Sequence, residues 1–363
     1  MALTEQALLA ALQTVIDPNT GKDFVLTKSL KNLQIHEHDV SFDVVLGYPA
    51  KSQLPALRKD LIAAAKTIAG VANVSVNISS EIVAHAAQRG VQLLPQVKNI
   101  IAVASGKGGV GKSTTAVNLA LALAAEGASV GLLDADIYGP SQPMMMGIEG
   151  RPESEDGQTM EPLENYGVQV MSIGFLVDQD EAMIWRGPMA TQALEQLLRQ
   201  TNWRNLDYLI VDMPPGTGDI QLTLSQRVPM TGAVIVTTPQ DIALLDAKKG
   251  IRMFEKVGVP ILGLVENMAV HICTQCGHAE HIFGVDGGKK MAATNGMDYL
   301  GALPLNMQIR LQADSGKPTV VADPDGDVAA IYKAMARQVA VKIAAKARDF
   351  SSKFPSIKVS KET

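Results

Sequence analysis

Eight consecutive residues combine glycines, lysines and a hydroxyl in the pattern G-x-x-x-x-G-K-[ST]. They are Gly106, Lys107, Gly108, Gly109, Val110, Gly111, Lys112 and Ser113, and Thr114 follows them. Without a Cβ atom, glycines let consecutive backbone N–H groups turn toward phosphate oxygens. The second lysine then reaches the β- and γ-phosphates, and the hydroxyl binds Mg²⁺. The pattern predicts a loop, from Gly106 to Thr114, that binds the phosphates of ATP.

The segments on either side of this loop have the character that the motif requires. Residues 100–104 form an apolar, β-branched run that predicts a buried parallel strand, and residues 114–125 are rich in Ala and Leu, which predicts a buried helix. The positive end of that helix would add to the attraction for phosphate. A glycine-rich turn that binds nothing would have to match the strand, the motif and the helix by coincidence.

Carboxylates follow two further apolar runs. Residues 129–133 lead into Asp134 and Asp136, and residues 207–211 lead into Asp212, which is followed by a Pro-Pro-Gly turn that contains Gly216. Because the carboxyl ends of parallel strands meet at one edge, these groups are expected beside the phosphate loop. The two segments resemble the switch I and switch II segments of P-loop ATPases, and that resemblance implies that Asp134 and Asp212 support Mg²⁺ and that the Gly216 N–H contacts the γ-phosphate. A turn that merely caps a helix is the alternative for the first pair.

The chain has two cysteines, Cys273 and Cys276, separated by two residues. A closed metal or cluster site needs four ligands, so a second copy of the chain would have to supply the other two. A bridging cluster and a bridging zinc ion both fit this count. Zinc held within one chain with His278 and His281 lacks the usual spacing, and a thioredoxin-like redox pair lacks its helix context.

Composition limits the classes of partner. The chain has 363 residues, 47% of them hydrophobic, with a formal net charge of −5, so a global attraction to nucleic acid or to an anionic membrane is not expected. No apolar run reaches the length of a membrane span, and the first residues have no basic lead. A cytoplasmic protein is predicted.

Four segments are predicted along the chain. Residues 1–80 read as a helix, a hairpin, a helix over 54–69 and a strand, which together form a small α+β domain. Residues 81–97 are a linker, residues 98–350 form the ATPase domain, and residues 351–363 are a polar basic tail. The alternation of strands and helices after residue 98 predicts an α/β fold, a P-loop NTPase with a doubly wound parallel sheet.

Lys107 gives the loop the form K-G-G-x-G-K-[ST], which resembles the deviant Walker A ATPases that include MinD, ParA and the nitrogenase iron protein. The resemblance implies a homodimer in which Lys107 reaches the nucleotide of the other subunit and acts in catalysis with Lys112. It also implies that Asp136 orients the attacking water and that Asn267 hydrogen-bonds adenine.

A closer resemblance rests on V-E-N-M at residues 265–268, followed by C-x-x-C-G at residues 273–277. Both motifs are similar to those of the Mrp/ApbC family of iron–sulfur cluster carriers. That resemblance implies ATP hydrolysis coupled to a [4Fe-4S] cluster bridging the dimer, with cluster donor proteins and apo client proteins as partners. The first 80 residues resemble the SufT-type small domain, although the loop at residues 48–51 lacks the cysteine that relatives often carry there.

Two rivals come from other functional classes. A MinD/ParA-like positioning ATPase would bind membrane or DNA and use the cysteine pair structurally, with zinc. A nucleotide-gated scaffold would bind ATP without hydrolysing it.

Overall fold

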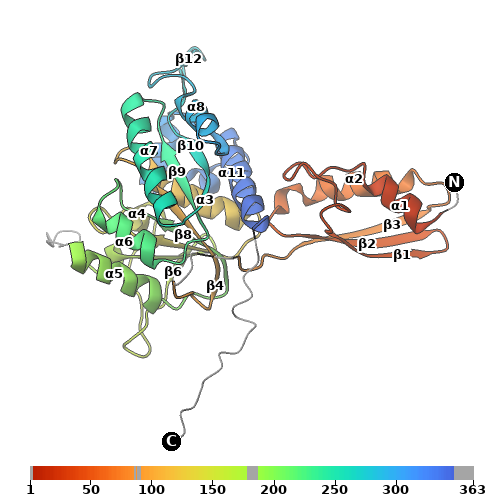
Figure 1. The fold of residues 1–363 in the computed structure, drawn as a ribbon, viewed down its shortest axis with the longest axis horizontal. Helices are drawn as coiled ribbons and strands as arrows, with labels where there is room; N and C mark the ends of the chain where they lie inside the picture. Colours follow the sequence, from red (N-terminus) through yellow and green to blue (C-terminus); the bar gives the residue numbers. More distant parts are fainter. Residues whose placement is uncertain (1–2, 86, 88–90, 178–186, 347–363) are drawn as a thin grey trace, which may run out of the picture.

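The computed structural model describes residues 3–85, 87, 91–177 and 187–346. Figure 1 shows a small domain that extends to one side of a larger one, and a connector runs between them. The predicted tail, 351–363, lies outside the described residues. No helix in the described part of the chain combines the length and apolarity needed to cross a bilayer.

The small domain is a three-stranded sheet covered by two helices. Its strand order is β1-β2-β3, in which β1 and β2 form the predicted antiparallel hairpin and β3 lies parallel to β2. Its elements are α1 (Glu5–Leu12), β1 (Leu30–His36), β2 (Asp39–Leu46), the 3₁₀ turn η1 (Lys51–Gln53), α2 (Leu54–Lys66) and β3 (Asn73–Ser80). Helix α2 ends earlier than predicted, because a turn leads to Gly70, whose positive φ of 96° no helix continues.

The large domain is built on eight strands in the order β13-β10-β9-β4-β8-β5-β7-β6. All neighbours are parallel except the edge strand β6, which pairs antiparallel with β7. The strands are β4 (Val97–Ala104), β5 (Val130–Asp134), β6 (Leu163–Asn165), β7 (Val168–Ser172), β8 (Leu206–Asp212), β9 (Gly232–Thr237), β10 (Ile261–Glu266) and β13 (Tyr299–Ala302). The predicted doubly wound α/β architecture is confirmed.

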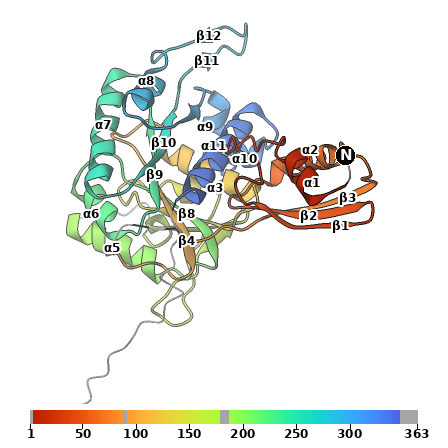
Figure 2. The ribbon, with the colours of Figure 1, turned by 45° about the vertical axis from the view of Figure 1, so that its right-hand side comes forward.

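Helices cover both faces of this sheet (Figures 1 and 2), with α3 and α11 on one face and α5, α6 and α7 on the other. The helical elements are α3 (Lys112–Ala125), α4 (Gln142–Met145), η2 (Ile173–Phe175), α5 (Gly187–Gln200), α6 (Asp219–Arg227), α7 (Asp241–Lys256), α8 (Gly287–Thr294), α9 (Met307–Asp314), α10 (Thr319–Ala322) and α11 (Asp327–Ala344). Helix α3 is buried along most of its length between the sheet and α11, so the helix that starts at the phosphate loop lies in the core.

A buried carboxylate joins the two domains. Glu126, which directly follows α3, accepts hydrogen bonds from the backbone N–H (2.9 Å) and the hydroxyl (2.6 Å) of Ser52 in the small domain. It also pairs with Arg337 of α11, and Arg337 donates from Nε to the side chain of Asn19 at 3.3 Å. The Glu126 side chain is fully buried, so its charge depends on these partners.

We predict that Glu126→Ala separates the two domains. Removing one partner of a buried ion pair costs about 3–5 kcal/mol, and here it also leaves Ser52 without its acceptor. Calorimetry should resolve two unfolding transitions in the variant. Limited proteolysis should cut the variant between residues 81 and 96 faster than the wild type.

Asp314→Ala is the matched control, because Asp314 belongs to an exposed ion pair with Arg310 on α9. Exposed pairs contribute up to about 1 kcal/mol, so this variant should unfold like the wild type. A Glu126→Ala protein with wild-type unfolding and wild-type cleavage would show that Glu126 does not hold the domains together.

Candidate functional site

The predicted phosphate loop connects the end of β4 to the start of α3. Gly111 adopts a φ of 80°, and a Cβ atom there would lie 2.1 Å from Nδ2 of Asn267. At Gly106, a Cβ atom would lie 2.1–2.5 Å from backbone atoms at the start of Ala247 and the end of Asp246, in α7. Both positions therefore require glycine, one for its backbone angle and the other for the close approach of a helix. Lys107 lies half-buried in the loop, and its carbonyl accepts a hydrogen bond from Ser105 at 2.9 Å.

Lys112 is buried at the start of α3, where two polar side chains surround its ammonium group. It forms an ion pair with Asp212 at the end of β8, and it donates to Oγ of Ser113 at 3.1 Å. The structure thus brings together three of the predicted residues from two segments of the chain. The ammonium is a cation held by a carboxylate and a hydroxyl, the oxygen ligands that Mg²⁺ prefers, so these residues fit a magnesium ion.

Asp134 organises the loop that follows β5. Its carboxylate accepts hydrogen bonds from the backbone N–H groups of Asp136 (3.1 Å), Ser141 (3.0 Å) and Gln142 (3.0 Å) and from the hydroxyl of Ser172 (3.1 Å). Burial, together with the nearby charge of Asp212, raises the pKa of Asp134 to about 7. Its contacts are those of a loop anchor, and its support of Mg²⁺ remains a prediction.

Asp136 and Gly216 lie on the two loops beside the phosphate loop. Burial raises the pKa of Asp136, and the positive charge of Lys112 opposes that shift. The Asp136 carboxylate therefore interacts electrostatically with the Lys112 ammonium group. The Gly216 N–H donates to the carbonyl of Ser105 at 3.1 Å. A contact from Gly216 to a γ-phosphate would therefore require the Gly216 loop to change partners.

Asn267 lies directly against the phosphate loop. Its Nδ2 donates to the carbonyl of Val110 at 2.8 Å, and its backbone N–H donates to Thr237 at 2.8 Å. The amide nitrogen is thus committed to the loop, and the amide oxygen is the atom that would meet adenine. The predicted contact with adenine is not tested by this geometry.

The cysteine pair forms the tip of a short hairpin that leaves β10 at the same edge of the sheet (Figures 1 and 2). Strands β11 (His271–Ile272) and β12 (Ala279–Glu280) pair antiparallel, and the Cys273 N–H donates to the carbonyl of His278 at 2.9 Å. Both thiols are free, and backbone N–H groups in the turn lower the pKa of Cys273, which favours the thiolate that binds metals.

Intrachain metal ligation finds little support in this hairpin. His281 contacts the carbonyl of Ala269 through Nδ1 at 2.8 Å, which leaves one ring nitrogen for a ligand. Among the described residues, no three His, Cys, Asp or Glu side chains are grouped to hold a metal ion. In the described part of the chain, Cys273 and Cys276 therefore form no closed metal site with other side chains.

Two buried side chains at this edge were not predicted. Gln142, the first residue of α4, donates from Nε2 to Asp212 at 2.8 Å. Glu266, at the end of β10, accepts from the N–H of Gly288 in the first turn of α8. Burial raises the pKa of Glu266. For Gln142 the sequence offers only its position after the Asp134 loop, where a glutamine before a proline is typical of an exposed turn.

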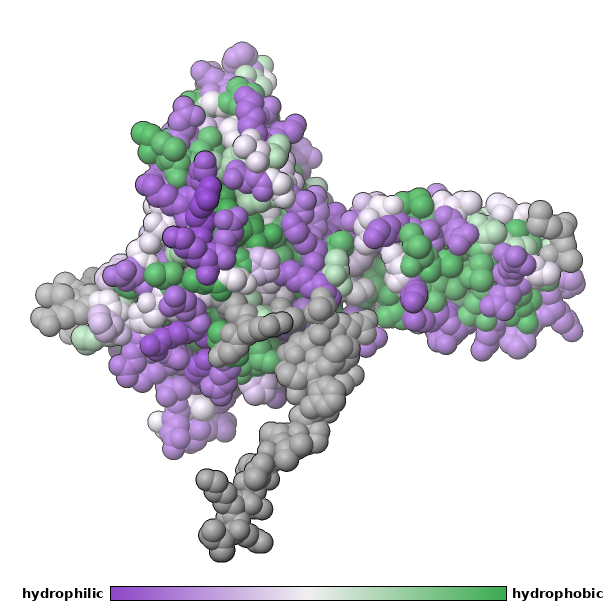
Figure 3. Space-filling model, viewed as in Figure 1, coloured by the Kyte–Doolittle hydropathy of each residue, from purple (hydrophilic) through white to green (hydrophobic). Residues whose placement is uncertain are grey.

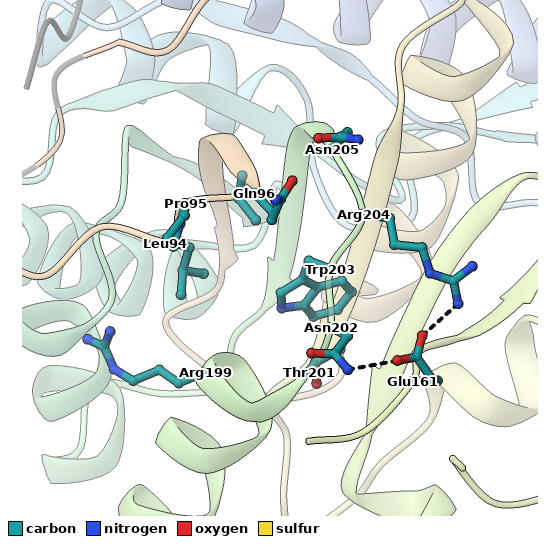
Figure 4. Close-up of a pocket in the computed structure, with 11 residues that line it drawn as sticks. Leu94, Pro95, Gln96, Glu161, Arg199, Thr201, Asn202, Trp203, Arg204 and Asn205 are labelled. Carbon is teal, nitrogen blue, oxygen red and sulfur yellow. Dashed lines mark hydrogen bonds and ion pairs between the residues drawn. The ribbon is translucent and has the colours of Figure 1, made fainter. Parts of the chain in front are cut away.

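A cavity of about 560 Å³ lies at the opposite ends of the strands, where the connector enters β4 (Figure 4). Its wall includes Trp203 and two arginines that already have acidic partners. Arg204 pairs with Glu161 at 2.8 Å, and Arg199 lies 3.6 Å from Glu195. This cavity lies at the opposite edge of the sheet from the phosphate loop and is separate from the predicted nucleotide site.

Comparison with known proteins identifies both domains. The family described as NUBPL iron-transfer P-loop NTPase matches residues 96–340, and the family described as iron–sulfur cluster assembly protein matches residues 5–76. The iron–sulfur cluster carrier protein of Escherichia coli K12 is 51% identical over 90% of this chain and 89% of its own length. That of Pseudomonas fragi is 62% identical over 74% of this chain and 94% of its own length.

Solved structures give the same architecture. The nucleotide-binding protein of Archaeoglobus fulgidus, in complex with ADP, has a TM-score of 0.56 at 36% identity and covers 64% of this chain and 90% of its own. The cell division ATPase MinD of Pyrococcus furiosus has a TM-score of 0.50 at 21% identity, over 66% of this chain and 98% of its own, and is similar in fold alone.

We predict that Lys112→Ala abolishes ATP hydrolysis, lowering kcat/KM at least about a hundredfold, because the loop loses the cation that pairs with developing phosphate charge. Phosphate release measures the rate, and circular dichroism verifies the fold. Lys98→Ala is the control, since Lys98 pairs with Asp207 at the far ends of β4 and β8. Hydrolysis at the wild-type rate in Lys112→Ala would overturn the phosphate-loop assignment.

Proposed function

This chain belongs to the family of NUBPL-type iron-transfer P-loop NTPases, and from that premise we propose that it is an ATP-hydrolysing carrier of iron–sulfur clusters. The cluster is its cargo, which it receives from donor proteins and passes to apoproteins in the cytoplasm. The observation that carries the proposal is that a short segment, residues 267–273, connects two free thiols to Asn267, whose side chain donates to the phosphate loop.

The nucleotide chemistry is assigned to residues of one edge of the sheet. Lys112 binds the β- and γ-phosphates, and Ser113 and Asp212 hold Mg²⁺, which offsets phosphate charge when bound. Asp136 orients the attacking water, and the Gly216 N–H senses the γ-phosphate. Because Lys112 now pairs with Asp212, it must exchange this carboxylate for phosphate when ATP binds.

The cargo is assigned to Cys273 and Cys276 of two chains. Two thiolates per chain supply four across a two-fold axis, which is the ligand count of a [4Fe-4S] cluster and also of a zinc ion. The carrier names of the relatives favour the cluster over zinc. They also favour a carrier over a MinD-like positioning ATPase, so neither membrane nor nucleic acid is included among the partners.

A homodimer face is proposed at the carboxyl edge of the sheet. Large apolar side chains are exposed on the segments that follow four of its strands: Tyr138, Met144, Ile242, Leu245, Ile272, Ile282, Val285, Met307 and Leu311. Figure 3 shows apolar surface of this kind at the upper end of the large domain, over α7. These exposed apolar side chains lie on the segments next to the phosphate loop and the hairpin. A second copy of the chain that covered them would cover both sites together.

Both ends of the hairpin segment are tied to the nucleotide side of the molecule. Before it, Asn267 donates to Val110 of the phosphate loop, and after it, the N-terminus of α8 donates to Glu266. A shift of the phosphate loop would therefore be transmitted to the base of the hairpin. This is the physical basis for coupling hydrolysis to cluster binding.

We predict that Cys273→Ala/Cys276→Ala holds no cluster after anaerobic reconstitution. Wild-type protein should bind iron and sulfide together, show visible charge-transfer absorbance, and have twice the mass of one chain by light scattering. Zinc without sulfide would instead support the bridging-zinc alternative.

The matched control is His278→Ala/His281→Ala, which removes the side chains that an intrachain zinc site would need. It should retain iron and sulfide like the wild type. If the cysteine variant contained as much iron and sulfide as the wild type, the bridging-cluster assignment would be wrong.

We predict that two inactive variants restore one another when mixed. Lys107→Ala lacks the lysine that serves the neighbouring site, and Asp136→Ala lacks a residue of its own site. A mixed dimer then contains one complete site, and an equal mixture should recover roughly a quarter of the wild-type ATP hydrolysis rate.

A mixture of Asp136→Ala with Lys112→Ala is the control, because both lesions lie in their own sites and no mixed dimer is complete. It should stay inactive. If the Lys107→Ala mixture is equally inactive, Lys107 acts within its own subunit or not at all.

A further inference from the structure

Gln142 is completely buried at the point where three parts of the nucleotide site meet. It is the first residue of α4, and its backbone N–H donates to Asp134, which fixes its position after the β5 loop. Its side chain then reaches across to the end of β8 and to the start of α3. Because Gln142 has no solvent exposure, its polar atoms need hydrogen-bond partners inside the protein.

The amide nitrogen of Gln142 has two such partners. Nε2 donates to Oδ2 of Asp212 at 2.8 Å and to the backbone carbonyl of Ser113 at 3.2 Å. The reverse orientation would place the amide oxygen against a carboxylate, two acceptors facing one another, so the contact with Asp212 determines which atom is nitrogen. Gln142 therefore holds one oxygen of Asp212 while Lys112 holds the other.

The amide oxygen of Gln142 has no hydrogen-bond partner among the described residues, although it is buried. The same is true of the neighbouring hydroxyl of Ser141. A buried acceptor without a hydrogen-bond partner is costly, so each such atom in a native structure calls for an explanation, and a bound water or ion is one of them. Here the unpaired oxygen belongs to an amide that touches both Asp212 and Ser113.

We propose that Gln142 is a positioning residue for magnesium, which orients Asp212 through Nε2 and accepts a hydrogen bond from a magnesium-bound water through Oε1. Mg²⁺ usually keeps several of its waters in protein sites, and each of these is a hydrogen-bond donor. The inference rests on the proposed use of Mg·ATP. It assigns to the β5 loop a direct part in the metal site beyond its two aspartates.

The test compares nucleotide affinity with and without magnesium in Gln142→Met, which keeps the length of the side chain and removes both polar atoms. Calorimetric titration with ADP should give wild-type affinity in EDTA. In Mg²⁺, the gain in affinity seen for the wild type should be about tenfold smaller. The Mg²⁺ concentration for half-maximal ATP hydrolysis should rise by a similar factor, as expected for the loss of one supporting contact.

Gln169→Met is the matched control, since Gln169 is a buried glutamine of β7 whose amide bonds to backbone atoms of Arg204. It should keep the wild-type response to magnesium. Gln142→Asn, which draws the amide back by one methylene, provides a second variant if the methionine variant does not fold, and it should show the same shift.

The outcomes separate the two proposals. If wild-type protein binds ADP equally with and without Mg²⁺, the proposed magnesium site itself fails. If the wild type responds to magnesium and both Gln142 variants respond equally, or if Gln169→Met shifts as far as they do, Gln142 has no part in holding the metal.

Discussion

The buried ion pair between Lys112 and Asp212 is the contact on which the nucleotide site depends. The two residues lie at the start of α3 and the end of β8, and the lysine is 6% exposed while the aspartate is fully buried. Either charge alone would be costly to bury, so each holds the other at the edge of the sheet. The pair thereby fixes the phosphate loop against β8, whose end leads into the Gly216 loop, and a ligand that displaces one charge must offer a counter-charge to the other.

Two neighbouring segments also hold the phosphate site together, because each contributes a hydrogen bond to it. Gln142 brings the β5 loop to Asp212, and Asn267 brings the end of β10 to the loop carbonyl of Val110. The cysteine hairpin starts a few residues beyond Asn267, so a short segment of chain connects the thiols to a residue that bonds to the phosphate loop. These hydrogen bonds are the connection on which the proposed coupling between nucleotide and cluster depends.

The sequence predicted those parts whose signals are local. The phosphate loop, the strand-end aspartates and the alternation of strands and helices all follow from short patterns, because glycine, chain direction and burial act within a few residues. Gln142 and Glu126 could not be found in this way, since their roles depend on partners from distant segments. The contact between Asn267 Nδ2 and the phosphate loop could not be predicted either, because it also joins distant segments. The resemblance singled out Asn267 only for its predicted contact with adenine.

Helix α3 gives the small domain a physical relation to the catalytic edge. Its first residue, Lys112, lies in the phosphate site, and Glu126, just past its last residue, holds Ser52 of the small domain. The SufT-like loop at residues 48–51 has no thiol, and its last residue, Lys51, donates its N–H to the Glu126 carbonyl at 3.1 Å. A close-packed helix transmits strain, so a displacement of Lys112 at its first turn would also shift Glu126 just past its end. The small domain is therefore placed to respond to nucleotide binding, or to restrain it.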